Sequence, residues 1–377
     1  MKHILIIISI LVIGLTSCSK RDYVNAIPAN STALVSVSAE DFVGEQSPFA
    51  SLLMPFVDND TKRMKGIDLT REIYLFASGD GNLGACAPVA DGGELADFIE
   101  RLQNLDILKN HTEQDGKDFY TINGQWVLGH DDYTLLIMGP VTGADAEARL
   151  IRSMARQMEK DDEESIRNSM LWQHLQERRS NIRMVAQASA LPEQISQAIT
   201  LGAPKGTSAD DVLLEADLSY KEGTLQLSGT TCSYNPNIRQ ALKKSHTLYN
   251  PITVDWQRIM GDSAVIGIFM NVKGQELMPQ IQGNRQLNTM LMGTGSYDKI
   301  RTNDGNLAIL LQTKPATDEG KGMFATTILN LPDEHIHNEE RLVVAVNIEA
   351  LAGPLEKTVA PYLGKVKRII YNMNTEQ

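Results

Sequence analysis

The stretch VLLEADLSYKEGTLQLSGTTC, residues 212–232, carries the clearest strand signal in the chain. Two β-rich runs, 212–220 and 224–232, stand on either side of Lys221-Glu222-Gly223. Runs of this kind that are separated by a few residues including glycine are typical of a β-hairpin. Because so short a connection can only join antiparallel strands, the stretch predicts antiparallel pairing at this point of the chain.

A second group of short strands precedes this hairpin. The intervening residues include Asp-Gly and Asn-Gly pairs, which are the strongest short-range hairpin signals. The pattern therefore predicts an antiparallel meander of four strands, at His111–Gln114, Phe119–Ile122, Gln125–Gly129 and Tyr133–Met138, with turns at Asp115-Gly116, Asn123-Gly124 and His130-Asp131-Asp132.

Helices and further strands are predicted from the spacing of apolar residues. Apolar residues at helical spacing predict helices over 41–56, 92–105, 144–160, 164–179, 192–201 and 237–244. Apolar, β-rich runs predict further strands over 33–38, 71–78, 83–90 and 182–188, and the stretch 248–253 is interpreted as a domain boundary. Helices that return to cover one face of an antiparallel sheet give an α+β fold.

The sequence also contains an internal repeat. NSTALVSV at 30–37 is similar to DSAVIGI at 262–268, and each is followed by a predicted helix, at 41–56 and 273–281. Each helix is followed in turn by Asp-Gly-Asn-Leu, at 80–83 and again at 304–307. A shorter strand–helix–strand sequence follows at 342–348, 351–363 and 366–372.

This recurrence predicts two related halves built from strand–helix–strand repeats. We expect an N-terminal α+β domain over 27–247 and a C-terminal α+β domain, a partial repeat, over 248–377. The fold class predicted is α+β, with antiparallel sheets and helices packed on one face.

The N-terminal residues MKHILIIISILVIGLTSC predict export. A basic start at Lys2 and an apolar run at 4–15 match a secretory signal. The run is shorter than the about 20 apolar residues that cross a bilayer. Leu15-Thr16-Ser17-Cys18 resembles the lipobox of bacterial lipoproteins, which implies a signal peptide over 1–17 and a lipidated Cys18 at the start of a tether, 18–26. An ordinary secretory signal in which Cys18 stands by chance is the alternative.

Composition narrows the possible partners. Hydrophobic residues make up 42% and charged residues 22% of the chain, which is typical of a globular protein. The formal net charge of −12 argues against nucleic acid, whose binding depends on many Lys and Arg contacts to phosphate. It also argues against electrostatic attraction to anionic lipid, so contact with a membrane is expected through the lipid anchor.

Apart from Cys18, the chain holds two cysteines, Cys86 and Cys232, each in a strand-like run. An exported protein can form a disulfide between them. Buried cysteines often act as small hydrophobic residues, so two separate thiols are favoured and the disulfide is the alternative.

Three motifs were weighed for chemistry. Gly79–Gly84 matches the GxGxxG motif of dinucleotide sites. Such a site needs a helix directly after the motif, whereas a strand is predicted there, so a turn is favoured. Ser263, in Gly261-Asp262-Ser263, would need a base to act as a nucleophile. The pair His335 and His337 offers imidazoles for that role or for a metal, although their polar surroundings are also typical of exposed histidines. No catalytic, cofactor or metal site is predicted.

Four parts of the chain together carry a family likeness. They are the lipobox, IPANSTALVSVSAEDF at 27–42, GDSAVIGIFMNVKGQEL at 261–277 and the closing strand–helix–strand segment. They resemble an uncharacterised family of Bacteroidetes lipoproteins, a domain of unknown function with a two-part extracytoplasmic body. The resemblance implies a role in the cell envelope and supplies no reaction.

We therefore expect a membrane-anchored extracytoplasmic lipoprotein, at the outer membrane and facing either the periplasm or the cell surface. A non-enzymatic binding or scaffold role is favoured, with a protein or glycan as partner and no cofactor. The alternatives are a lipid-handling protein and an envelope hydrolase that uses Ser263 with His335 or His337.

Overall fold

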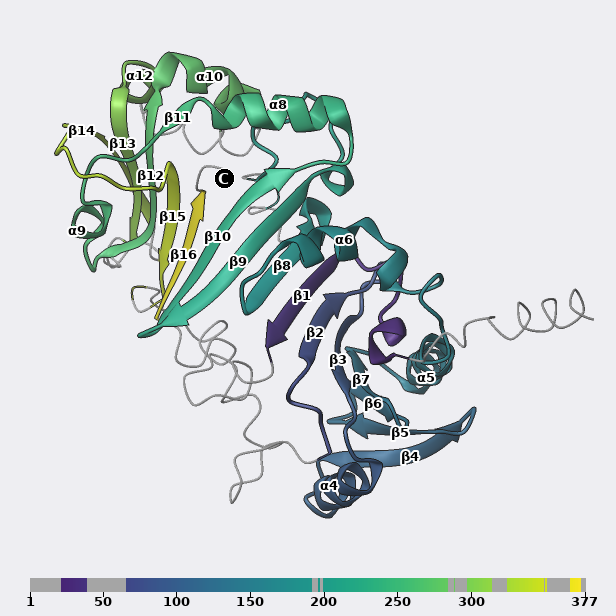
Figure 1. Cartoon of the computed structure of the whole chain (residues 1–377). Helices are drawn as coiled ribbons and strands as arrows, with labels where there is room; N and C mark the ends of the chain where they lie inside the picture. Colours follow the sequence, from purple (N-terminus) through teal and green to yellow (C-terminus); the bar gives the residue numbers. More distant parts are fainter. Residues whose placement is uncertain are drawn as a thin grey trace, which may run out of the picture. The chain divides into compact units, whose positions relative to one another are not determined.

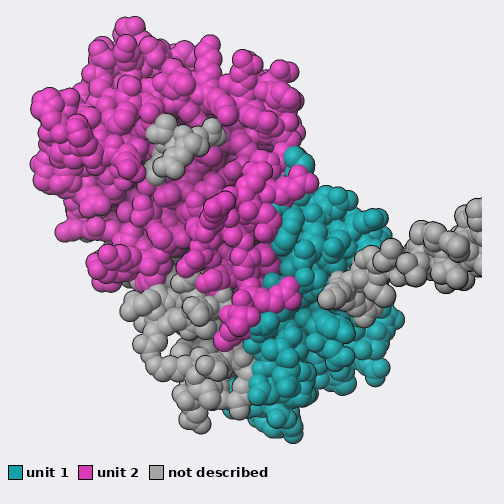
Figure 2. All heavy atoms as spheres, viewed as in Figure 1, with its two compact units in different colours: residues 1–31, 66–68, 78–172 teal, residues 32–65, 69–77, 173–377 magenta. Residues whose placement is uncertain are grey.

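The computed structural model describes residues 22–38, 66–191, 196, 199–283, 288, 297–313, 324–348, 350 and 367–373. The chain forms two compact units, which Figure 2 shows in teal and magenta. Unit 1 consists of residues 1–31, 66–68 and 78–172, and unit 2 of residues 32–65, 69–77 and 173–377. Cys18 and the predicted helices at 41–56 and 351–363 lie outside the described residues, as does most of the predicted helix at 192–201.

Unit 1 is built on an antiparallel sheet in the order β3-β7-β6-β5-β4 (Figure 1). The strands are β3 (Leu83–Pro88), β4 (Leu108–Gln114), β5 (Lys117–Ile122), β6 (Trp126–His130) and β7 (Thr134–Gly139). The helical elements are η1 (Tyr23–Ala26), α4 (Gly92–Asn104), α5 (Ala144–Gln157) and η3 (Ile166–Asn168). The predicted meander is confirmed, because β4 to β7 pair in chain order.

Both predicted tight turns of the meander adopt the left-handed backbone that their sequences favour. Asp115 and Gly116 have φ of 53° and 68°, and Asn123 and Gly124 have φ of 51° and 66°. Positive φ at both central residues is characteristic of the type I′ turn, whose twist matches that of the paired strands.

Unit 2 contains the remaining strands, in the order β14-β13-β12-β15-β16-β10-β9-β8-β1-β2, with β11 beside β12. They are β1 (Ala33–Ser38), β2 (Glu72–Ala77), β8 (Ile182–Gln187), β9 (Leu213–Lys221), β10 (Thr224–Cys232), β11 (Tyr249–Asn250), β12 (Ala264–Lys273), β13 (Asp304–Thr313), β14 (Phe324–Leu331), β15 (Leu342–Asn347) and β16 (Arg368–Met373). All the described pairs are antiparallel except β10 with β16, which is parallel.

The helical elements of unit 2 are mostly short. They are η4 (Ala188–Ala190), η5 (Ala209–Asp211), α8 (Pro236–His246), α9 (Trp256–Met260), α10 (Gly274–Gly283) and α12 (Tyr297–Arg301). The helix α6 (Met170–Glu177) begins in unit 1 and ends in unit 2. The helix predicted over 164–179 is therefore divided between η3 and α6. None of the described helices has the length and apolarity needed to span a bilayer.

The hairpin of residues 212–232 is confirmed as β9 and β10. Glu222 and Gly223 have φ of 49° and 82°, so this turn also has two left-handed residues. The carbonyl of Gly223 accepts hydrogen bonds from the backbone N–H groups of Lys367 and Arg368, at 2.7 and 3.1 Å. The turn therefore joins the hairpin to the start of β16.

Helices cover both faces of the sheet in unit 2, so the prediction of helices on one face is wrong there. Leu277 and Ile281 of α10 pack in one core cluster with Val272 of β12. Trp256 of α9 packs in a second cluster with Phe269 of β12. Because both sets of alternating residues on β12 are apolar, both faces of the strand must be covered.

The second strand–helix–strand repeat is present as β12, α10 and β13. The helix of the first repeat lies outside the described residues, so the relation between two halves stays a prediction. The predicted boundary near residue 247 falls inside unit 2, between α8 and β11.

The β9–β10 turn gives a test of this fold. Glu222→Asn is expected to raise the free energy of unfolding by about 0.5 kcal/mol, because asparagine tolerates positive φ better than glutamate does. Gly223→Ala is expected to lower it by about 1 kcal/mol, because a Cβ is strained at that φ. Urea denaturation of both variants measures these changes, and equal effects of the two substitutions would contradict the assigned turn.

Candidate functional site

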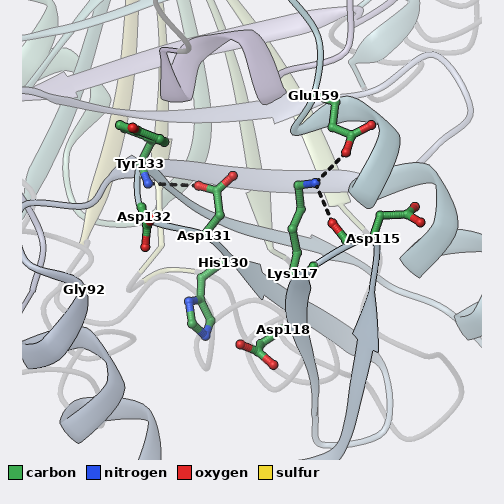
Figure 3. A pocket seen from close by; sticks show the side chains of 10 residues that line it. Gly92, Asp115, Lys117, Asp118, His130, Asp131, Asp132, Tyr133 and Glu159 are labelled. Carbon is green, nitrogen blue, oxygen red and sulfur yellow. Dashed lines mark hydrogen bonds and ion pairs between the residues drawn. The ribbon is translucent and has the colours of Figure 1, made fainter.

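A polar pocket opens at one edge of the meander in unit 1. Alternate turns of a meander lie at the same edge of its sheet, so the β4–β5 turn and the β6–β7 loop lie together. The pocket between them has a volume of about 320 Å³. It is lined by Gly92, Asp115, Gly116, Lys117, Asp118, His130, Asp131, Asp132, Tyr133 and Glu159 (Figure 3).

One wall of the pocket is fixed by a buried lysine. The side chain of Lys117 is only 4% exposed, and its Nζ donates to Glu159 Oε1 at 2.9 Å and to the Asp115 carbonyl at 3.3 Å. Figure 3 shows this ammonium group held between the two acceptors. A buried charge is tolerated only when it is paired, so Glu159, just beyond α5, is tied to the start of β5.

The β6–β7 loop is held by Asp131. Its Oδ1 accepts hydrogen bonds from the backbone N–H groups of Tyr133 at 2.9 Å and Thr134 at 2.8 Å. These bonds close the loop and leave Tyr133, which is 53% exposed, beside Asp132 at the pocket. An exposed aromatic ring next to a carboxylate is suited to contact with a ligand.

The end of the pocket nearest the sheet carries His130 and Asp118. Asp118 stands directly across from His130 in the β5–β6 pair. Its Oδ1 also lies 2.7 Å from Nε2 of His111. The ring of Tyr120 stacks between the two imidazoles, at centroid distances of 5.0 Å to His111 and 6.2 Å to His130.

Burial lowers the pKa of His130, and the nearby carboxylate of Asp118 only partly opposes this effect. The imidazole is therefore neutral near pH 7 and offers one donor and one acceptor nitrogen. The remaining charges in the lining are the carboxylates of Asp115, Asp118, Asp131, Asp132 and Glu159 and the single ammonium of Lys117. The pocket is acidic and rich in hydrogen-bond acceptors.

Comparison with known proteins shows the family. A model of a domain of unknown function, DUF4836, matches residues 43–294, or 252 of the chain's 377 residues. The chain belongs to the DUF4836 family. The matched region contains the whole lining of the pocket.

Curated proteins give no match to this DUF4836 chain. Among solved structures, crystal form I of TP0453 is similar at 9% identity and a TM-score of 0.34, covering 54% of this chain and 76% of that one. Crystal form III of TP0453 is similar at 10% identity and the same TM-score, covering 61% of this chain and 88% of that one.

Cys86 and Cys232 are not joined by a disulfide in this DUF4836 protein. Cys86, buried in β3, donates its thiol proton to the carbonyl of Tyr23 at 3.1 Å. Cys232, at the end of β10, donates to Glu215 Oε1 at 2.7 Å. Each thiol thus donates a hydrogen bond to an oxygen atom, and the two sulfurs are not bonded to each other.

The structure does not bring the predicted hydrolase residues together. The Oγ of Ser263 accepts a hydrogen bond from Gln312 Nε2 at 3.2 Å, and within the described residues no hydrogen bond joins Ser263 to a histidine. The side chain of His335 is 88% exposed and lies 3.4 Å from Asp333. The segment 79–84 forms a turn that leads into β3, as predicted, and the helix required for a dinucleotide site is absent from that position.

Sequence reasoning missed the pocket although it identified the residues that frame it. Asp115, Asp131 and Asp132 were interpreted only as turn residues. The available signal was the alternation of turns in a meander, which places the first and third turns at the same edge.

The lowered pKa of His130 makes a prediction about stability. Because the unfolded state binds a proton on this residue more readily than the folded state does, stability contributed by the neutral imidazole is present above the unfolded pKa of about 6.5 and is lost as the pH falls below it. In His130→Gln, the decrease in the free energy of unfolding between pH 7 and pH 5 should be smaller than in the original protein.

Denaturant unfolding at several pH values measures this difference. His335→Gln is the matched control, because the side chain of His335 is 88% exposed and lies outside the pocket lining. An identical pH dependence for His130→Gln and the original protein would contradict the assignment.

Proposed function

We propose that this protein is a lipid-anchored, extracytoplasmic binding protein without enzymatic activity, and that the pocket of unit 1 binds a polyhydroxylated ligand such as the sugar of an envelope glycan. The observation that carries the proposal is the lining of the pocket, which combines carboxylates, an ammonium group, a neutral imidazole and an exposed tyrosine.

This lining suits a neutral polyol. Hydroxyl groups donate hydrogen bonds to the carboxylates of Asp118 and Asp132 and accept them from Lys117 or from the imidazole of His130. The exposed face of Tyr133 supplies a surface for the apolar side of a sugar ring. A volume of about 320 Å³ is at the lower end of the range for small-molecule sites.

The same lining disfavours the alternative ligands. An acyl chain would leave several carboxylates without hydrogen-bonding partners, which costs free energy, so the lipid-handling alternative has less support. Anionic ligands would be repelled by the surplus of carboxylates. A hydrolase based on Ser263 has less support as well, because the hydrogen bond that its Oγ accepts comes from Gln312.

The location rests on residues 1–18. Their basic start, apolar run and terminal cysteine support export and lipidation at Cys18. The resemblance to Bacteroidetes lipoproteins supports a place in the outer membrane of a Gram-negative cell. Each buried methylene of an acyl chain contributes about 0.8 kcal/mol, so an anchor with more than one chain holds the protein at the membrane.

The ligand proposal predicts the behaviour of two pocket variants. In isothermal titration against soluble envelope oligosaccharides, a sugar that binds the original protein should bind Asp132→Asn roughly tenfold more weakly, because a hydrogen bond to a charged acceptor is lost. Tyr133→Ala should weaken binding roughly fivefold through loss of ring contact.

Asp106→Asn is the matched control, because it removes the same charge in unit 1 at a residue outside the pocket lining. It should leave the affinity unchanged. Equal losses in Asp132→Asn and Asp106→Asn, or no response to any oligosaccharide, would overturn the ligand assignment and leave a protein partner as the alternative.

The anchor is tested separately. In cells that make the full chain, the protein should enter the detergent phase on Triton X-114 separation, and Cys18→Ala should move it to the aqueous phase because the acylated sulfur is gone. Ser19→Ala, one residue away, should behave like the original chain. Unchanged partitioning of Cys18→Ala would exclude lipidation at this residue.

A further inference from the structure

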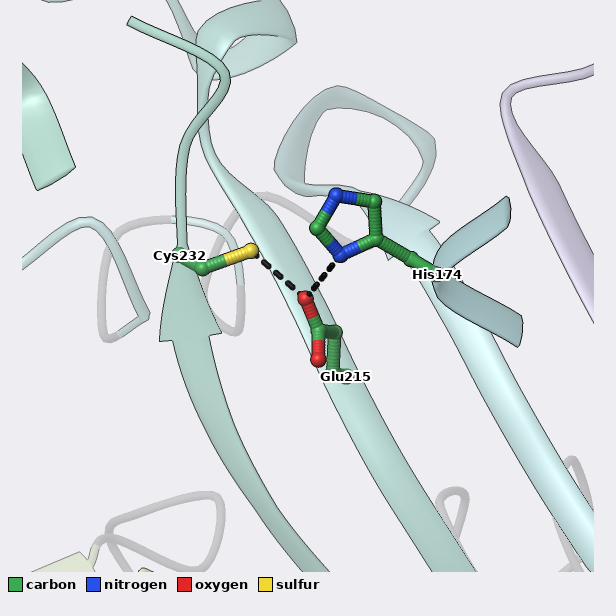
Figure 4. Close-up of side chains that lie close together, drawn as sticks. All are labelled: His174, Glu215 and Cys232. Carbon is green, nitrogen blue, oxygen red and sulfur yellow. Dashed lines mark hydrogen bonds and ion pairs between the residues drawn. The ribbon is translucent and has the colours of Figure 1, made fainter. Parts of the chain in front are cut away.

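Unit 2 contains a cluster of metal-binding side chains on one face of its sheet. Glu215 lies on β9 directly across from Thr230, and Cys232 lies two residues farther along β10. The two side chains therefore share one face of the sheet. His174, from α6, covers the same spot, and Figure 4 shows all three side chains converging.

The donor atoms lie close together. Nδ1 of His174 and Sγ of Cys232 are each 2.7 Å from the same carboxylate oxygen of Glu215. The imidazole nitrogen, the sulfur and a carboxylate oxygen all lie within 4.8 Å of one another. Among the described residues, this is the one group of at least three His, Cys, Asp and Glu side chains with such spacing.

The site is shielded from water and built on regular elements. The side chains of His174 and Glu215 are 21% and 14% exposed. Arg178, one helical turn after His174, pairs through two nitrogens with Asp217, which stands two residues after Glu215 on β9. Ser180 donates to the same aspartate. This ion pair holds the end of α6 against β9 and thereby positions His174 next to Glu215.

The charges favour a dication. Arg178 and Asp217 balance each other, although one guanidinium nitrogen also lies 3.7 Å from Glu215. The cluster itself contains one carboxylate and one ionisable thiol. A divalent cation bound to the carboxylate and to the thiolate would leave the site neutral, with the thiol proton released to solvent.

A neighbouring tyrosine provides an independent observation. The hydroxyl of Tyr234 is buried and has no hydrogen-bond partner among the described residues. Its ring meets the imidazole of His174 edge-on, at a centroid distance of 5.4 Å. A buried hydroxyl without a partner costs free energy, so the surroundings of His174 contain an unsatisfied polar group.

We propose that His174, Glu215 and Cys232 bind one divalent transition-metal ion of the zinc type. Nitrogen and sulfur donors select zinc and its neighbours over calcium and magnesium, which prefer oxygen ligands throughout. Three protein ligands leave one coordination position for water or another group. This site lies in a different unit from the acidic pocket, and the inference does not depend on the ligand proposed there.

The test uses the full-length chain after treatment with a chelator. Titration with Zn²⁺ should show one tight equivalent, and Co²⁺ should give a thiolate-to-metal charge-transfer band together with the intense visible bands of a four-coordinate ion. Cys232→Ser should abolish the charge-transfer band, and His174→Gln and Glu215→Gln should each weaken binding more than about 100-fold, since even second-shell changes cost 10–100-fold.

Two controls separate this site from adventitious binding. Cys86→Ser removes the other thiol of the described chain, and the double variant His335→Gln/His337→Gln removes the exposed imidazoles; neither should change the stoichiometry or the cobalt spectrum. Circular dichroism of each metal-free variant confirms folding. If one ligand variant does not fold, the spectrum of the original chain and the other two variants still decide the question.

The proposal is overturned if the original chain binds no stoichiometric zinc or gives no thiolate charge-transfer band. It is also overturned if the band survives Cys232→Ser, or if the double histidine variant abolishes binding.

Discussion

Backbone hydrogen bonds on both edges of β10 hold unit 2 together. On one edge β10 pairs with β9 through a tight turn, and on the other it pairs in parallel with β16, at the far end of the chain. Ser228 and Asn372, which are 144 residues apart in sequence, add a side-chain hydrogen bond of 2.7 Å across this second edge. A parallel pair needs a long connection, and here residues 233–367 provide it. Cys232, at the end of β10, pairs with Leu213 on the β9 edge.

The alternation of β9 explains why the candidate metal site has its particular composition. Leu214 and Ala216 face a core that includes Ile238 and Leu242 of α8, so the intervening residues Glu215 and Asp217 face the opposite side. Charged groups on a covered face must be paired, and His174 of α6 and Arg178, just after its end, meet this need. Arg178 forms the ion pair with Asp217, and His174 lies beside the Glu215 carboxylate that also accepts from the Cys232 thiol.

Much of the fold follows from local sequence, and the sites follow only in part. Turns with Asp-Gly, Asn-Gly and Glu-Gly were predictable because positive φ favours few residues, and the strands around them appear at the predicted positions. The two covered faces of β12 were not predicted, although adjacent apolar residues such as Phe269 and Met270 are typical of a strand buried on both sides. His174 is 41 residues from Glu215, and no local pattern in the sequence brings them together.

The structural unit extends beyond the region that the DUF4836 model matches. The strand β12 lies inside that region, yet β13 and β15, which pair with its two edges, both begin after residue 294. The free edge of β10 is likewise covered by β16, from the same later part of the chain. Exposed strand edges promote association with other chains, so residues 43–294 alone would leave three long edges without partners. We conclude that β13, β15 and β16 complete the sheet to which β9, β10 and β12 belong, although they lie outside the matched family region.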